Sequence, residues 1–156
     1  MVEDGKVVLE RAYGFLNLET ETPLTTSSIF EIASLTKQFT AVAIMMLVEE
    51  AKMRLDDPVS TYIDGTPAEW SRITLRHLLT HTSGLDISAM PRVDGSAPLS
   101  ISTRQAFEFI LRQPMFAATG RTGWYSDAGY VLLGMVIEKE SGRTYREFIT
   151  ARMFNR

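Results

Sequence analysis

Residues 34–48 read Ser-Leu-Thr-Lys-Gln-Phe-Thr-Ala-Val-Ala-Ile-Met-Met-Leu-Val, and they predict the main helix of the chain. Apolar side chains recur there at three- and four-residue spacing, which is the pattern of a helix with a buried face. From Ala41 to Val48 the sequence is apolar on nearly every side, so we expect burial between other elements. The helix is predicted over residues 34–53 and is stopped by Leu55-Asp56-Asp57-Pro58.

The start of this helix brings a hydroxyl and an amine together. Ser34 and Lys37 lie three residues apart, so their side chains share one helix face and can touch. A serine hydroxyl becomes a good nucleophile when a base takes its proton, and a neutral amine can be that base. Free N–H groups at a helix start can also stabilise an oxyanion. The alternative is a capping serine and a solvated lysine, because a Ser-x-x-Lys pattern often arises by chance.

Tyr125-Ser126-Asp127 is a second candidate group, at the start of another predicted helix and behind the glycine-containing connection 120–123. A tyrosine in this place can move a proton if cations lie beside it. The alternative is a core aromatic with its hydroxyl at the surface, since Trp124 and Tyr130 make the region aromatic in any case.

The remaining sequence predicts strands first and helices afterwards. Residues 7–18 are rich in β-branched and aromatic side chains and indicate one or two strands behind the turn Asp4-Gly5. Helices are expected at about 74–81 with a stop at Gly84, from Ser102 or Thr103 to before Pro114, at about 126–139 with an end at Ser141-Gly142, and at about 144–153. Residues 86–98 indicate a loop. We therefore expect an α+β segment that is mainly helical. Two strands alone are marginally stable, so its antiparallel sheet is expected to be incomplete.

Taken together, five ordered blocks resemble one family, the serine β-lactamase and penicillin-binding-protein-like superfamily. The branch is that of class C β-lactamases, D-alanyl-D-alanine carboxypeptidases and serine esterases. The blocks are residues 4–8, 28–41, 55–59, 73–85 and 125–134. The resemblance covers essentially the whole chain and implies a β-lactamase/DD-peptidase-like fold.

The resemblance also implies roles for three residues. Ser34 matches the acylated nucleophile, Lys37 matches its partner amine, and Tyr125 matches the tyrosine of the Tyr-x-Asn motif that helps to move the proton. In a mechanism of this kind Ser34 attacks an ester or amide carbonyl, its own N–H supplies half of the oxyanion hole, and water releases the acyl group. The resemblance implies no metal and no organic cofactor.

Two departures from the family pattern affect this interpretation. Asp127 stands where the motif usually has Asn, at a position that would face substrate, and its carboxylate is expected to pair with Lys37 and keep the amine charged. The third motif, Lys-Thr-Gly or His-x-Gly, does not occur in the sequence. We therefore expect residues 1–156 to be a single partial domain, an N-terminal fragment without the C-terminal strands, which by itself is inactive or impaired.

His77 and His81 stand four apart and would share one face of the predicted helix, as two metal ligands would. The Glu of a His-Glu-x-x-His motif is absent, and a third ligand is not apparent. The resemblance of the block 73–85 implies a packing and capping role for both histidines.

Composition excludes several other classes of function. The absence of cysteine rules out disulfides, a thiolate nucleophile and cysteine-rich zinc sites. A net charge of -3 does not indicate the basic surface that binds nucleic acid. The longest apolar stretch has eight residues, too few to span a bilayer. The N-terminus does not resemble a signal peptide, so the chain is either cytoplasmic or exported with its signal removed.

Two functional hypotheses remain open. The first is a serine hydrolase that acts through Ser34 on a small-molecule or peptide-like substrate, as an esterase or peptidase in preference to a dedicated β-lactamase because of Asp127. The second is a binding or interaction module that keeps the fold without a competent site. Either could form a homo-oligomer that covers the edges of the incomplete sheet.

Overall fold

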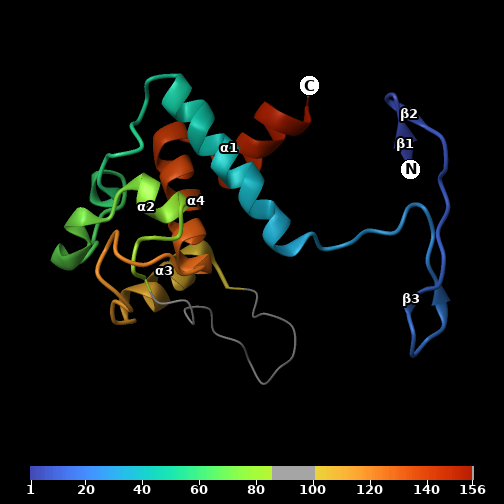
Figure 1. Ribbon diagram of the computed structural model, residues 1–156, viewed down its shortest axis with the longest axis horizontal. Helices are drawn as coiled ribbons and strands as arrows, with labels where there is room; N and C mark the ends of the chain where they lie inside the picture. The colour runs from blue at the N-terminus through green and yellow to red at the C-terminus, as the bar shows by residue number, and fades with distance from the viewer. Residues whose placement is uncertain (86–100, 156) are drawn as a thin grey trace. The chain divides into compact units, whose positions relative to one another are not determined.

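The computed structural model describes residues 1–85 and 101–155, and its internal contacts divide the chain into two compact units, residues 1–34 and 35–156. The first unit contains two short antiparallel hairpins (Figure 1). Strands β1 (Val2–Glu3) and β2 (Lys6–Val7) form one hairpin, and β3 (Phe15–Asn17) and β4 (Thr22–Pro23) form the other.

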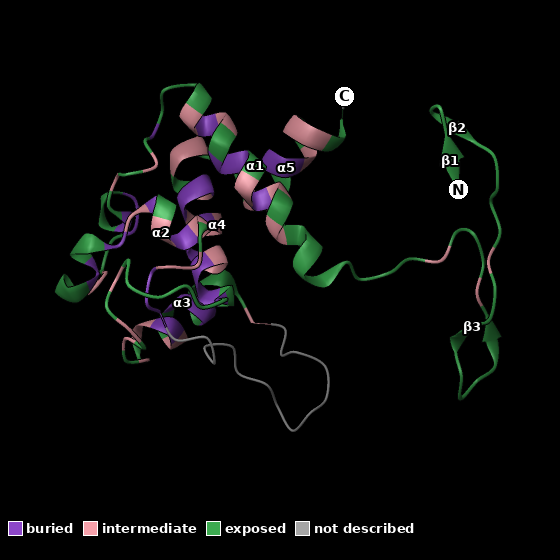
Figure 2. Cartoon of the chain, viewed as in Figure 1, coloured by how far each residue is buried: buried purple, intermediate pink, exposed green. Residues whose placement is uncertain are grey.

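The stretch of residues 7–18, where one or two strands were expected, is only partly in strands. Its two ends are in strands, but residues 8–14 belong to no described strand. The turn at Asp4-Gly5 is confirmed, with both residues at positive φ. None of the residues 1–34 is buried, as the exposed colouring of this unit in Figure 2 shows. Alternating apolar residues favour a strand, but a strand also needs a paired neighbour.

The second unit is built from helices. The α-helices are α1 (Thr36–Glu49), α2 (Leu75–Leu79), α3 (Thr103–Leu111), α4 (Asp127–Ser141) and α5 (Tyr145–Ile149). The shorter turns are the 3₁₀ helices η1 (Ala33–Leu35), η2 (Val59–Thr61) and η3 (Ala68–Arg72), and the π-helical turn η4 (Thr150–Phe154).

Helix α4 lies at the centre of this unit and contacts α1, α2, α3 and α5 (Figure 1). Its buried residues repeat every four positions along one half of the helix: Ala128, Gly129, Leu132, Leu133, Val136 and Ile137. Helix α1 instead buries one face, through Ala43, Ile44 and Leu47, while Val42 and Met45 are about half exposed at 48% and 47%. The burial between other elements that the sequence predicted for α1 is thus correct for one face only, because no described element covers its other face.

Capping residues explain where the helices begin. Ser102, one of the two cap residues that the sequence indicated, caps α3 and exchanges hydrogen bonds with Gln105. Thr144 and Glu147 form the same capping box at the start of α5. At the other end of α4, Gly142 adopts φ +67°, the left-handed conformation that commonly ends a helix.

Helix α2 ends at Leu79, earlier than the predicted stop at Gly84. Gly84 has a different function in the structure. Its carbonyl accepts a hydrogen bond of 2.8 Å from the Phe116 N–H, and a Cβ added at Gly84 would collide with the Ala117 carbonyl. The glycine therefore allows two chain segments to approach each other closely.

Candidate active site

Ser34 lies in the 3₁₀ turn η1, directly before α1. The predicted helix start at Ser34 is therefore two residues early, since α1 begins at Thr36. The residue before the serine, Ala33, has φ +43°, a conformation that non-glycine residues adopt rarely. Backbone strain of this kind is often found at functional sites.

Lys37 forms an ion pair with Asp127 across α1 and α4. Its Nζ lies 2.5 Å from Oδ1 of Asp127, with the lysine side chain 17% exposed and the aspartate side chain 53% exposed. The pairing expected from the sequence is thus confirmed. Burial lowers the pKa of Lys37, but hydrogen bonds to Asp127 and Tyr125 outweigh burial and raise that pKa above 10.5. Lys37 is therefore an ammonium at neutral pH.

Two tyrosine rings lie against the same ammonium. Nζ of Lys37 lies 4.7 Å from the ring centroid of Tyr125 and 5.6 Å from that of Tyr130. Both distances are in the range of cation–π contacts. Tyr125 is 52% exposed, so its phenol is accessible to a small molecule. The structure thus brings together Lys37, Tyr125 and Asp127, three of the four predicted site residues, within the second unit.

His81 adds a contact to this cluster that the spacing of the sequence did not predict. Its ring is stacked on Tyr125 with 4.6 Å between centroids, and it lies 5.2 Å from the ring of Tyr130. The backbone N–H of Ser126 donates a 3.1 Å hydrogen bond to Nδ1 of His81. The sequence signal was the block 73–85, which contains His81 but does not show which side chain it contacts.

The two histidines do not share a helix face, because α2 ends before His81. His77 belongs to the capping box of α2, where its Nδ1 lies 3.1 Å from the Thr74 hydroxyl, so its capping role is confirmed. Within residues 1–85 and 101–155, no group of three or more His, Cys, Asp or Glu side chains could hold a metal ion. Nor does any helix in those ranges have the length and apolar character needed to cross a membrane.

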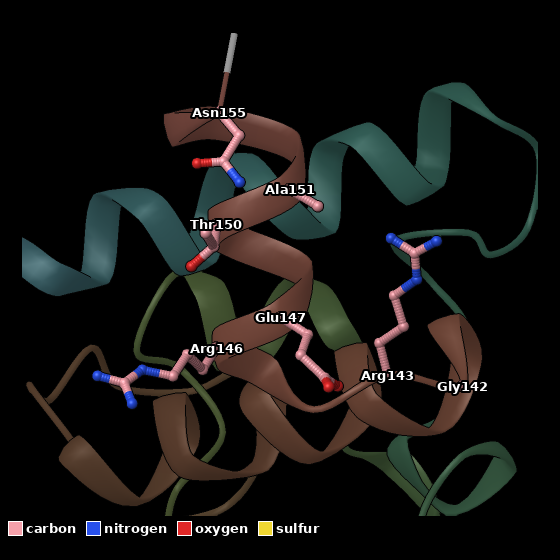
Figure 3. Close-up of a pocket in the computed structure, with 7 residues that line it drawn as sticks. All are labelled: Gly142, Arg143, Arg146, Glu147, Thr150, Ala151 and Asn155. Atoms are coloured by element: carbon pink, nitrogen blue, oxygen red, sulfur yellow. The ribbon is translucent and has the colours of Figure 1, made fainter.

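A surface hollow lies away from this cluster, along α5 and η4 (Figure 3). Arg143 and Arg146 extend in different directions from its rim, with Glu147 between them. None of the four predicted site residues lines it. The loop predicted over residues 86–98 lies outside the described residues.

Comparisons with known proteins agree with the resemblance of the sequence blocks. The profile of the beta-lactamase family matches residues 1–156. Penicillin-binding protein 4* of Bacillus subtilis is 34% identical over 155 residues, which cover 97% of this chain and 34% of that protein. The chain therefore spans about a third of the length of this curated relative.

Solved structures give the same result for the fold. The octameric penicillin-binding protein homologue from Pyrococcus abyssi superposes with a TM-score of 0.80 at 37% identity, over 97% of this chain and 36% of that one. The D-amino acid amidase from Ochrobactrum anthropi SV3, complexed with L-phenylalanine, gives a TM-score of 0.79 at 28% identity, over 91% and 39%. The predicted β-lactamase/DD-peptidase-like fold is confirmed.

Proposed function

The chain belongs to the beta-lactamase family of serine hydrolases, and from this premise we propose that Ser34 is the nucleophile that forms an acyl-enzyme. The chain spans about a third of its relatives' length. The proposed acyl-enzyme activity is therefore that of the whole natural protein that contains these residues. The observation that carries the proposal is the cluster of Lys37, Tyr125 and Asp127, with Lys37 in the first turn of the helix that Ser34 precedes.

The proton path follows from the charge of Lys37. An ammonium cannot accept a proton, so the amine that Asp127 keeps charged is a poor base for Ser34. Tyr125, as the phenolate that the Lys37 ammonium stabilises, then takes the proton of Ser34 and becomes a neutral phenol as the serine oxygen bonds to the carbonyl carbon. Lys37 stabilises negative charge on the phenol oxygen, and the Ser34 N–H stabilises the developing oxyanion. The bond between the carbonyl carbon and the leaving group then breaks, the leaving group takes the proton that Tyr125 carries, and water later hydrolyses the acyl-enzyme.

The proposed substrates are esters or peptide-like amides. Among the similar proteins are a D-amino acid amidase and penicillin-binding proteins, whose names point to amide chemistry. We place Asp127 beside the bound substrate, where its second carboxylate oxygen can accept a hydrogen bond from an amine or amide N–H. An acceptor at this position favours a peptidase, amidase or esterase over a dedicated β-lactamase.

A fluorophosphonate probe tests this function because it bonds only to activated serines. In the natural protein we expect one probe per chain, bound to Ser34, and no labelling of Ser34→Ala. Ser102→Ala is a matched control, since that serine caps α3 and lies outside the cluster. Undiminished labelling of Ser34→Ala would refute the assignment of the nucleophile.

The second candidate is a binding module without hydrolytic activity, and the Lys37–Asp127 ion pair is the observation that favours it. A module of this kind would bind esters or amides without forming an acyl-enzyme. It predicts that intact protein mass stays unchanged with the probe, while equilibrium dialysis detects binding of a peptide-like amide.

We also propose self-association through the exposed hairpins of residues 1–34, whose strands are only two or three residues long. The octameric homologue of P. abyssi supports this proposal, although its assembly is a property of that protein. Light scattering of the natural protein tests it, and a monodisperse monomer would contradict it.

A further inference from the structure

We propose that His81 is a positioning residue, which holds Tyr125 against Lys37 through its neutral ring and its backbone. The inference rests on the proposed function, because it gives His81 a role only through the proton transfer assigned to Tyr125.

The backbone of His81 sets the direction of the ring. Its φ of +57° lies in the left-handed region, just after the end of α2 and its C-cap residue Thr80. The chain turns there, and the His81 carbonyl accepts a 2.8 Å hydrogen bond from the Trp124 N–H. A non-glycine residue at positive φ is uncommon and is maintained by the contacts around it.

Three contacts from His81 reach three consecutive residues. Its carbonyl holds Trp124, its ring stacks on Tyr125, and its Nδ1 accepts the N–H of Ser126. This segment enters α4, whose first residue is Asp127, the partner of Lys37. The ring and the backbone carbonyl of His81 thereby fix the segment that contains Tyr125.

Helix α4 also restrains the His81 ring. Tyr130, one helical turn into α4, lies 5.2 Å from the His81 ring, and its hydroxyl donates a 3.1 Å hydrogen bond to the Leu79 carbonyl. The imidazole thus contacts tyrosines on two segments, which restricts both its rotation and that of the Tyr125 ring.

The contact to Ser126 requires one protonation state. Nδ1 can accept an N–H only when it carries no proton, so the tautomer must be neutral with its proton on Nε2. Protonation of Nδ1 would place a donor against the Ser126 N–H. The groups that face the ring are the charged Lys37 of α1 and Asp127 of α4, and the phenols of Tyr125 and Tyr130.

The electrostatics agree with this geometry. Burial, and next the charge of Lys37, lower the pKa of His81 below 6.5, against the opposing carboxylate of Asp127. At neutral pH the ring is therefore in the form that accepts the Ser126 N–H. Acidification would release the segment that carries Tyr125.

Two substitutions separate positioning from simple packing. His81→Phe keeps an aromatic ring for stacking but removes the acceptor. His81→Asn removes the titratable ring but places Oδ1 where Nδ1 was, and asparagine tolerates the left-handed backbone. His77→Asn is the matched control, since His77 caps α2 and does not contact residues 124–127.

The experiment measures the rate of fluorophosphonate labelling of Ser34 in the natural protein as a function of pH. We expect His81→Phe to slow labelling by about 10- to 100-fold at neutral pH, the size of effect that slight misplacement of a reacting group produces. His81→Asn keeps the acceptor but loses the stacked ring, so it should label faster than His81→Phe. It should also lose the fall in rate that we expect of the wild type below about pH 6.5. His77→Asn should keep that fall.

Labelling of Ser34 in His81→Phe at the wild-type rate would overturn the inference, and so would an unchanged acid fall in His81→Asn. If His81→Phe does not fold, the pH profile of His81→Asn still decides the question. Labelling that persists in Ser34→Ala would instead refute the proposed function, so the two failures are distinguishable.

Discussion

At the scale of single residues, the Lys37–Asp127 ion pair determines the chemistry that the site can perform. Asp127 stands where the family usually has an amide, and the structure shows the consequence, a charged lysine beside Tyr125. The sequence predicted this pair only because the resemblance aligned two segments that lie 90 residues apart. The stacking of His81 on Tyr125 was not predictable, because it depends on a left-handed backbone after α2.

Asp127→Asn is expected to increase the labelling of Ser34. Removing the carboxylate lowers the pKa of Lys37 relative to the wild type, because Asp127 is a cause of its rise. The Lys37 ammonium then stabilises the phenolate of Tyr125, the proposed base, without a competing carboxylate, so labelling should rise, by about tenfold for each 1.4 kcal/mol of added stabilisation. Asp56→Asn breaks the exposed pair with Arg76 and serves as the control, with an unchanged rate. A slower rate in Asp127→Asn would contradict the role assigned to the carboxylate.

Ser126→Ala should leave the free energy of unfolding unchanged or increase it by about 1 kcal/mol. The Ser126 side chain is buried, and its hydroxyl has no hydrogen-bond partner among the described residues. Thr40→Val is the contrasting variant, because the Thr40 hydroxyl lies 2.7 Å from that of Tyr145 and its loss should cost about 1 kcal/mol. Urea denaturation measures both, and a clear loss of stability in Ser126→Ala would show that its hydroxyl has a partner.

At the scale of elements, the helices were predicted well because their ends carry local signals. Ser102 and Gly142 mark the start of α3 and the end of α4 as the sequence indicated. The one or two strands predicted over residues 7–18 are shorter in the structure, since pairing depends on a partner strand that the pattern of one stretch does not specify. The end of α2 was placed at Gly84 because glycine often ends helices, whereas here it permits a close contact.

Gly84→Ala should destabilise the second unit by more than the backbone strain alone. The residue has φ +81°, which costs an L-amino acid about 1–2 kcal/mol, and the new methyl group would collide with the Ala117 carbonyl. Gly65→Ala is the matched control, with φ +79° and no atom within 4 Å of the added methyl group. Thermal denaturation should show a larger decrease in Tm for Gly84→Ala. Equal decreases in Tm would mean that the segment containing Ala117 moves away without a loss of stability.

At the scale of the whole molecule, the fold class followed from five blocks in a fixed order, and the family comparison confirms it. That residues 1–156 form one partial domain stays a prediction. The role of each site residue also stays a prediction, because a family resemblance assigns roles that only chemistry on this chain can test.

The stability of the protein should decrease as the pH falls through the titration of His81. The pKa of this histidine is lowered by folding, so the unfolded chain binds the proton more readily, and stability is lost as the pH falls below about 6.5. Carboxylates with lowered pKa values, such as Asp56, lose their contribution to stability only at lower pH. Urea denaturation at neutral and mildly acidic pH should show a smaller decrease in His81→Asn than in the wild type. Equal decreases would mean that His81 titrates as it does in the unfolded chain.

The most direct test of the central claim is to map the site of fluorophosphonate labelling in the natural protein by intact mass and peptide mass spectrometry. The account predicts a single probe on the peptide that contains Ser34, with no labelling in Ser34→Ala. A probe on another serine, or an unlabelled protein that still hydrolyses esters or amides, would contradict the claim that Ser34 is the nucleophile.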